Sequence, residues 1–95
     1  METCEIVWTP ISSSPWGSIT VGYFRAEVAR ADGASEIGRS QAFATARADG
    51  LPHRFDRQHN GYLKALVDQL VADGWELTSD AGSNWWSYRF CRLVA

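Results

Sequence analysis

The sequence predicts an α+β fold, in which an antiparallel sheet of four to five strands carries one helix packed on one face. Two segments of alternating apolar and polar residues lie toward the ends of the chain, and residues 60–73 have the periodicity of an amphipathic helix. Turns that contain glycine or proline separate these segments. We therefore expect the order β-β-β-α-β-β in a single domain spanning residues 1–95.

The first two strands are predicted from alternation and composition. Cys4, Ile6 and Trp8 share one side of the first strand, which is expected to end at Pro10. Residues 18–30 are rich in β-branched and aromatic side chains, which favour strands. In this second strand one row contains Ile19, Val21 and Tyr23, and the other contains Thr20, Phe24, Ala26 and Val28.

A hairpin is predicted next, because Asp32-Gly33 is a frequent turn pair in which glycine tolerates a positive φ. The third strand, residues 36–43, then returns antiparallel to the second and places Ile37, Arg39 and Gln41 on one side. Residues 44–59 are polar and irregular, so they are interpreted as a loop that crosses from the sheet to the helix.

The helix is predicted at residues 60–73, with Asn60 as its N-cap and Gly74 ending it in the left-handed conformation. Its apolar positions follow helical spacing and draw one stripe, formed by Leu63, Leu66, Val67, Leu70 and Val71. The stripe indicates which side of the helix packs on the sheet.

Two strands close the domain, at residues 74–78 and 84–94. In the last strand the aromatic row of Trp86, Tyr88 and Phe90 is expected to face the helix, because burying these rings removes a large apolar area from water. The opposite row contains Trp85, Ser87, Arg89 and Cys91.

One helix can cover only one face of the sheet, so the uncovered face is the candidate functional surface. Its predicted binding residues are Trp85, Arg89, Tyr23, Arg25 and Arg39. Aromatic residues and arginine are enriched at protein interfaces, which favours a protein partner or a homo-oligomer. The alternative is a nucleic-acid or small-ligand binding module on the same face. Glutamates in the strands, at positions 5, 27, 36 and 76, are expected to pair with these arginines.

The charge of the chain weakens the nucleic-acid alternative. Eleven acidic residues against nine basic ones give a formal net charge of -2, so there is no overall positive field to attract phosphates. Neither a leader pattern nor an apolar run long enough to span a membrane is recognised, which predicts a cytoplasmic protein without a membrane partner.

The reactive residues of the sequence match no catalytic, metal-binding or cofactor-binding pattern. Cys4 and Cys91 are far apart in sequence and are expected to be free thiols. His53 and His59 bracket Asp56 in a loop, but their spacing matches no zinc site and requires no thiol-based site. We therefore predict no catalytic residue, no metal and no cofactor.

Two short motifs resemble a group of small bacterial domains of unknown function: "LVADGWELTSD" and "WWSYRFCR". The matched positions are Cys4, Glu5, Ile6, Ser40, Phe43, Leu70, Gly74, Trp75, Glu76, Trp86, Phe90 and Arg92. The resemblance implies a fold in which Gly74 ends the helix, Trp75 packs where the chain reverses and Phe90 fills the interior. It implies no reaction. "SSSPWGSI" and the adjacent Trp85 and Trp86 depart from the pattern.

Overall fold

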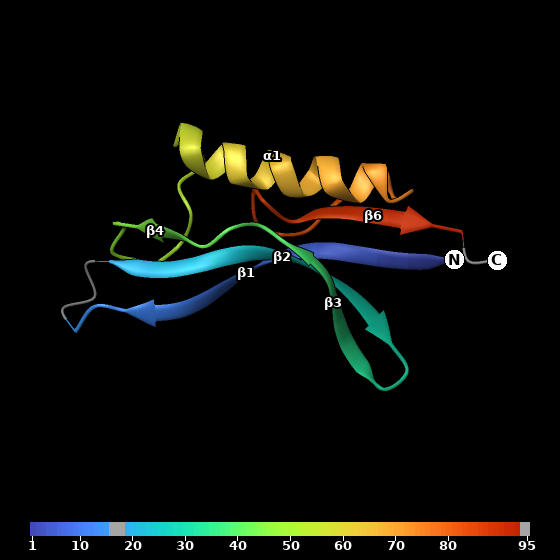
Figure 1. Ribbon diagram of the computed structural model, residues 1–95, viewed down its shortest axis with the longest axis horizontal. Helices are drawn as coiled ribbons and strands as arrows, with labels where there is room; N and C mark the ends of the chain where they lie inside the picture. The colour runs from blue at the N-terminus through green and yellow to red at the C-terminus, as the bar shows by residue number, and fades with distance from the viewer. Residues whose placement is uncertain (16–18, 94–95) are drawn as a thin grey trace.

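Six antiparallel strands and one helix form the part of the chain that the computed structural model describes, residues 1–15 and 19–93 (Figure 1). The elements are β1 (Glu2–Ser13), β2 (Thr20–Arg30), β3 (Gly33–Arg39), β4 (Phe43–Thr45), α1 (Arg57–Ala72), β5 (Glu76–Ala81) and β6 (Tyr88–Arg92). The strand order across the sheet is β3-β2-β1-β6-β5, and β4 pairs with β2. The α+β class is confirmed, with one strand more than expected. Ser18 and Val94, the outer ends of two predicted strands, lie outside the described residues.

β1 and β2 form the longest ladder, and β1 does not end at Pro10 as predicted. A register shift between Pro10 and Ser12 leaves Ile11 as an extra residue, and pairing with β2 continues to Ser13. Proline is tolerated here because β6 pairs only with Glu2–Glu5, so β1 has a single neighbouring strand at Pro10. The bulge therefore takes the place of the expected strand end.

The predicted third strand is broken in two. β3 ends at Arg39 and β4 begins at Phe43, although both pair with β2. Ser40 bridges this gap, because its N–H donates to the carbonyl of Phe24 and its hydroxyl accepts from the N–H of Phe24. The backbone groups of β2 thus remain satisfied where the strand is interrupted.

A second bulge, at Ile37, overturns the prediction that Ile37 and Arg39 share a side. Glu27 pairs with Glu36 and Ala26 with Gly38, so Ile37 is the extra residue. Ile37 packs against the core, while Arg39 lies opposite Arg25. One inserted residue reverses the alternation expected from a regular strand.

α1 begins one turn earlier than predicted. Asp56, not Asn60, is the N-cap, and its carboxylate accepts from the N–H groups of Gln58 and His59. The Asn60 side chain instead donates to the carbonyls of Arg54 and Asp56. The predicted end is confirmed at Gly74, which has a φ of 92°.

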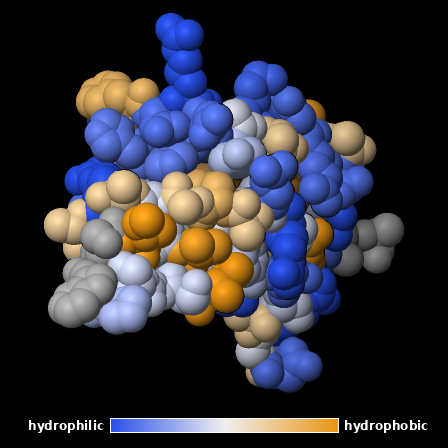
Figure 2. Space-filling model, turned by 60° about the vertical axis from the view of Figure 1, so that its left-hand side comes forward, coloured by the Kyte–Doolittle hydropathy of each residue, from blue (hydrophilic) through white to orange (hydrophobic). Residues whose placement is uncertain are grey.

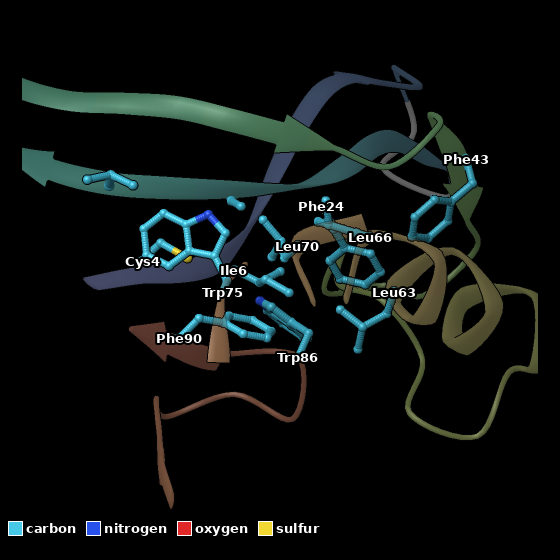
Figure 3. Packing of buried hydrophobic residues seen from close by; sticks show 12 residues of the cluster. Cys4, Ile6, Phe24, Phe43, Leu63, Leu66, Leu70, Trp75, Trp86 and Phe90 are labelled. Atoms are coloured by element: carbon cyan, nitrogen blue, oxygen red, sulfur yellow. The ribbon is translucent and has the colours of Figure 1, made fainter. Parts of the chain in front are cut away.

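The core lies between α1 and one face of the sheet (Figure 3). Leu63, Leu66 and Leu70 point from the helix toward a cluster of aromatic and aliphatic side chains. The sheet and the turns supply Cys4, Ile6, Phe24, Ala26, Val28, Phe43, Trp75, Trp86 and Phe90. Trp86 and Phe90 are buried as expected, but Tyr88 is 38% exposed and lines a groove beside α1 instead of joining the cluster.

Candidate functional site

The face of the sheet opposite α1, called the open face below, is built from the strand positions that alternate with the core positions. Cross-strand partners point to the same side of a sheet, so the register identifies its members. They include Glu5 and Val7 of β1, Tyr23, Arg25 and Glu27 of β2, Glu36 and Arg39 of β3, and Arg89 of β6. No described element covers this face (Figure 1).

Charges of opposite sign occupy two neighbouring rows of the open face. The acidic row runs across the strands through Glu36, Glu27 and Glu5 and ends at Arg89. The basic row contains Arg39 and Arg25 and ends at Val7. Along β2 the rows are two residues apart, which is about 6.6 Å in a strand.

Each arginine of the open face contacts a glutamate of the same face, as the sequence predicts. Arg25 pairs with Glu27. The Nη2 of Arg39 lies 2.8 Å from Glu36 Oε2, and the Nε of Arg89 lies 2.6 Å from Glu5 Oε1. These hydrogen bonds raise the pKa of the Arg39 and Arg89 guanidinium groups above the ordinary arginine value. The six charges of the three pairs therefore cancel.

Arg39 and Arg25 differ in how the chain itself satisfies their guanidinium groups. The guanidinium carbon of Arg39 lies 4.6 Å from the centre of the Tyr23 ring, a cation–π contact that helps to fix its position. The Nε of Arg25 is buried and has no hydrogen-bond partner among the described residues. An unsatisfied donor of this kind is costly, so the surroundings of Arg25 are not saturated by the chain itself.

Four of the five predicted binding residues are brought together: Arg89, Tyr23, Arg25 and Arg39 share the open face. The predicted position of Trp85 on this face is wrong. Trp85 packs against the core, edge-on to Phe24 and Trp86 at ring-centre distances of 6.1 and 5.6 Å. Trp85 and Trp86 lie in a turn before β6, so the alternation assumed for a strand does not apply to them.

Trp85 also holds the segment that precedes α1. Its indole Nε1 donates to the carbonyl of Pro52 at 3.3 Å, and the Nε1 of Trp8 donates to the carbonyl of Gly50 at 3.2 Å. The hydroxyl of Thr45 adds a bond to the carbonyl of Leu51. The predicted crossing loop is thus fixed by hydrogen bonds from three different elements or turns, and Trp85 has a structural role.

A second surface lies on the other side of the sheet and was not predicted. A groove between α1 and strands β5 and β6 encloses about 360 Å³. Its lining residues are Asn60, Leu63, Lys64, Val67, Leu77 and Tyr88. The only sequence signal for it is the width of the helical apolar stripe, because Val67 is half-buried and Val71 is exposed.

The histidines, Asp56 and the cysteines do not form a catalytic arrangement. The Nδ1 of His59 accepts from the N–H of His53, and its Nε2 lies 3.3 Å from the carbonyl of Ala44, so both ring nitrogens are engaged. Backbone hydrogen bonds from His59 and Gln58 lower the pKa of Asp56. Within residues 1–15 and 19–93, no three His, Cys, Asp or Glu side chains are grouped closely enough to hold a metal ion.

The two free thiols lie on opposite faces of neighbouring strands. Cys4 pairs with Phe90 and faces the core, whereas Cys91 pairs with Thr3 and faces the open side. Burial raises the pKa of the Cys4 thiol to about 11. The thiolate, which is the reactive form, is therefore suppressed at Cys4.

A scan against protein-family models and searches of curated proteins and of solved structures found no match to this chain. The resemblance to small bacterial domains therefore stays a prediction. α1, the only helix among the described residues, has neither the length nor the apolar character needed to cross a membrane.

Proposed function

We propose that this chain is a non-catalytic assembly module that binds protein through the open face, and that its first partner is a second copy of itself. The observation that supports this proposal is the position of the acidic row beside the basic row on a face without a cover. An interface between identical copies requires one patch that is complementary to itself, and two parallel rows of opposite charge meet this requirement.

A two-fold axis that runs across the strands, midway between the rows, would superpose them. Rotation about this axis lays the acidic row of one copy over the basic row of the other. Glu27 of one copy then faces Arg25 of the other, and Glu36 faces Arg39 in the same way. Packed sheets lie about 10 Å apart, a distance that arginine and glutamate side chains can bridge together.

The existing ion pairs reduce the cost of association. Arg39 is already held by Glu36 and stacked on Tyr23, so fewer side-chain rotamers need to be ordered on binding. The side chains of Glu27 and Glu36 are only 25% and 26% exposed, so part of their desolvation has occurred on folding. The resulting interface is polar, and we expect its strength to fall as salt is added.

The same pairing argues against the nucleic-acid alternative. Each of the three arginines on the open face already contacts a carboxylate, so binding a phosphate would release few counterions. We further propose a cytoplasmic location. The free thiols of Cys4 and Cys91 support it, because disulfides are rare in that compartment.

The oligomeric state of charge variants tests the proposal. At low salt, the mass of the wild-type protein measured by light scattering should rise with concentration from 10.6 kDa toward twice that value. Arg25→Glu places a carboxylate opposite Glu27 of the second copy and should keep the protein monomeric. Arg25→Glu combined with Glu27→Arg exchanges the rows on β2 and should restore the dimer.

Arg47→Glu is the matched control, because Arg47 pairs with Asp49 in the segment before α1 and lies outside the open face. It should dimerise like the wild-type protein. A wild-type protein that remains at 10.6 kDa at every concentration in low salt would refute self-assembly. Salt-sensitive binding of a single-stranded oligonucleotide that Arg25→Glu abolishes would favour the nucleic-acid alternative instead.

A further inference from the structure

A hollow and an aromatic side chain lie on the open face, at the two outer margins of the charge rows. Beyond the acidic row is a hollow of about 180 Å³, called the Ala29 hollow below. Its lining residues are Thr3, Cys4, Glu5, Glu27, Ala29 and Arg89. Beyond the basic row is Tyr23, which the register of β1 and β2 places on the same side as Arg25.

β2 places Tyr23 and Ala29 at equal distances from the two-fold axis of the dimer proposed above. The axis passes midway between Arg25 and Glu27, at the level of Ala26. Tyr23 and Ala29 are each three residues from Ala26, which is about 10 Å along a strand. The rotation lays β2 of one copy antiparallel over β2 of the other. Tyr23 of each copy therefore comes over Ala29 of the other.

The two positions also differ in size in the way that such a contact requires. Ala29 is exposed and lies opposite Ala34 of β3, which is exposed as well, so the side chains at this level of the face are short. Packed sheets lie about 10 Å apart, and close packing sets a long side chain of one sheet against a short one of the other. A tyrosine over an alanine meets this requirement.

Tyr23 is suited to anchor such a contact, because the chain already restricts its ring. The guanidinium carbon of Arg39 lies 4.6 Å from the ring centre, and the Nε of Arg39 donates to Glu36 at 2.9 Å. A tyrosine also supplies a large contact area at a low cost in conformational entropy. Tyrosine and arginine are enriched among the residues that dominate the binding energy of interfaces.

The lining of the Ala29 hollow suits the polar end of a tyrosine. Glu5, Glu27 and Arg89 supply charged groups beside the small side chains of Thr3 and Ala29. A carboxylate accepts several hydrogen bonds, so Glu5 can accept one from a tyrosine hydroxyl while it stays bonded to Arg89.

Given the dimer on which this contact rests, we propose that Tyr23 of each copy inserts into the Ala29 hollow of the other and fixes the register of the two sheets. The charge rows do not fix it, because sliding one copy along the rows by one strand, about 4.8 Å, still lays acidic over basic side chains. Both tyrosines are seated only in the symmetric arrangement. Tyr23 and Ala29 thus determine which of these arrangements forms.

Nuclear Overhauser effects between the two copies test this proposal without a substitution. The dimer is assembled at low salt from one copy labelled with carbon-13 and one unlabelled copy. Within one copy, Tyr23 and Ala29 are six residues apart on β2, about 20 Å, which is too far for such an effect. Effects between the Tyr23 ring and the Ala29 methyl group should therefore appear, and only between copies. A wild-type dimer without them would overturn this contact and leave self-assembly intact, whereas a wild-type monomer would refute both.

Substitutions measure what the contact contributes to dimerisation. Tyr23→Ala should raise the dissociation constant of the dimer, measured by sedimentation equilibrium, at least tenfold. Ala29→Tyr fills the hollow at an exposed position, so it should keep the fold and weaken the dimer to a similar extent. The double variant exchanges anchor and hollow and should dimerise more tightly than either single variant.

Tyr88→Ala is the matched control, because Tyr88 is exposed beside α1 on the other side of the sheet. It should dimerise within twofold of wild type. Dimerisation of Tyr23→Ala or of Ala29→Tyr at wild-type strength would overturn the proposal. A double variant weaker than both single variants would do the same.

Discussion

The two faces of the sheet are built from alternate residues of the same strands, yet they are stabilised in different ways. On the face under α1, Phe24 and Phe90 are completely buried among apolar side chains. One position away, Arg25 and Arg89 lie on the open face and contact glutamates. The first face depends on the cover provided by the helix, whereas the second is neutralised by its own ion pairs. A face of this second kind can remain in water or meet another polar surface without refolding.

A third kind of surface lies at the margin between these two. The groove between α1 and strands β5 and β6 has apolar side chains like the covered face but is open to solvent like the open face. Figure 2 shows further apolar side chains grouped on the side of the molecule that faces the viewer. Ile11, in β1, and Ile19, directly before β2, are also exposed. Uncovered apolar area is thus found at the ends and margins of the sheet, and the open face has little of it.

The largest effect is expected when a side chain is removed from the covered face. Phe24 contacts the rings of Trp8, Phe43, Trp85 and Trp86. Phe24→Ala should therefore lower the free energy of unfolding by about 3–5 kcal/mol, through lost burial and a residual cavity. Denaturant titration followed by tryptophan fluorescence measures this loss.

Val7→Ala is the comparison for that variant, because Val7 is a half-buried apolar residue of the open face. It should cost less than about 1 kcal/mol, since most of the area it removes is not in the core. Similar costs for the two variants would show that the open face is packed in solution. In that case the contrast between the faces, and the dimer geometry proposed above, would both need revision.

The sequence was sufficient to predict that one face of the sheet is apolar and covered by the helix and that the other is charged. Alternation in β2 separates Phe24 from Arg25, and helical spacing identifies Leu63, Leu66 and Leu70 as the cover. These features are local, so one sequence contains them. The pairing of arginines with glutamates on the same face was also predictable, because both are placed by the same alternation.

The errors arise where long-range pairing or a turn interrupts the alternation. The bulge at Ile37 and the break after Arg39 depend on hydrogen bonds with β2, which no local pattern specifies. Trp85 was assigned to the open face because residues 84–94 were treated as one continuous strand, whereas β6 begins only at Tyr88. The rows of charge could not be predicted either, since a shift of register by two residues would place different side chains side by side.

The next largest effect is expected in the reactivity of the thiols, which report on both faces from adjacent positions in the sheet. Cys4 is buried under the helix and its pKa is raised to about 11, mainly by desolvation. Relative to a thiol of pKa 9.0, a shift of this size lowers the thiolate fraction at neutral pH by about 100-fold. Cys91 is half-buried and faces the open side of the sheet.

Alkylation by iodoacetamide, followed by mass spectrometry of the labelled peptides, measures the difference. We expect Cys91 to be modified faster than Cys4 in the folded protein, because Cys4 is buried and its thiolate is suppressed. The two rates should become similar in denaturant, which serves as the control. Equal rates in the folded protein would indicate that the helix often moves away from the sheet. The side chains of the covered face would then be exposed to solvent for part of the time.

The smallest effect is expected at the start of α1, where Asp56 is the N-cap and stabilises the first turn of the helix. The Asp56 carboxylate accepts from the N–H of His59 and Gln58, and the first of these bonds is the main reason for its lowered pKa. A carboxyl group whose pKa is lower in the folded state stabilises the fold above its unfolded pKa. This contribution is lost as pH falls through the folded pKa, so the relevant window lies below about pH 4.

Asp56→Asn retains a side-chain oxygen that can cap the helix but removes the charge. At pH 6 the wild-type protein should have a slightly higher Tm than Asp56→Asn, and the gap should close as pH is lowered below 4. Asp32→Asn, in the exposed turn of the β2–β3 hairpin, carries the same change of charge away from the helix and should show no comparable closing of its gap. A gap for Asp56→Asn that stays constant across this range would mean that the charge does not help to hold the helix. The helix would then be held on the sheet by the packing of Leu63, Leu66 and Leu70, without a contribution from the Asp56 charge.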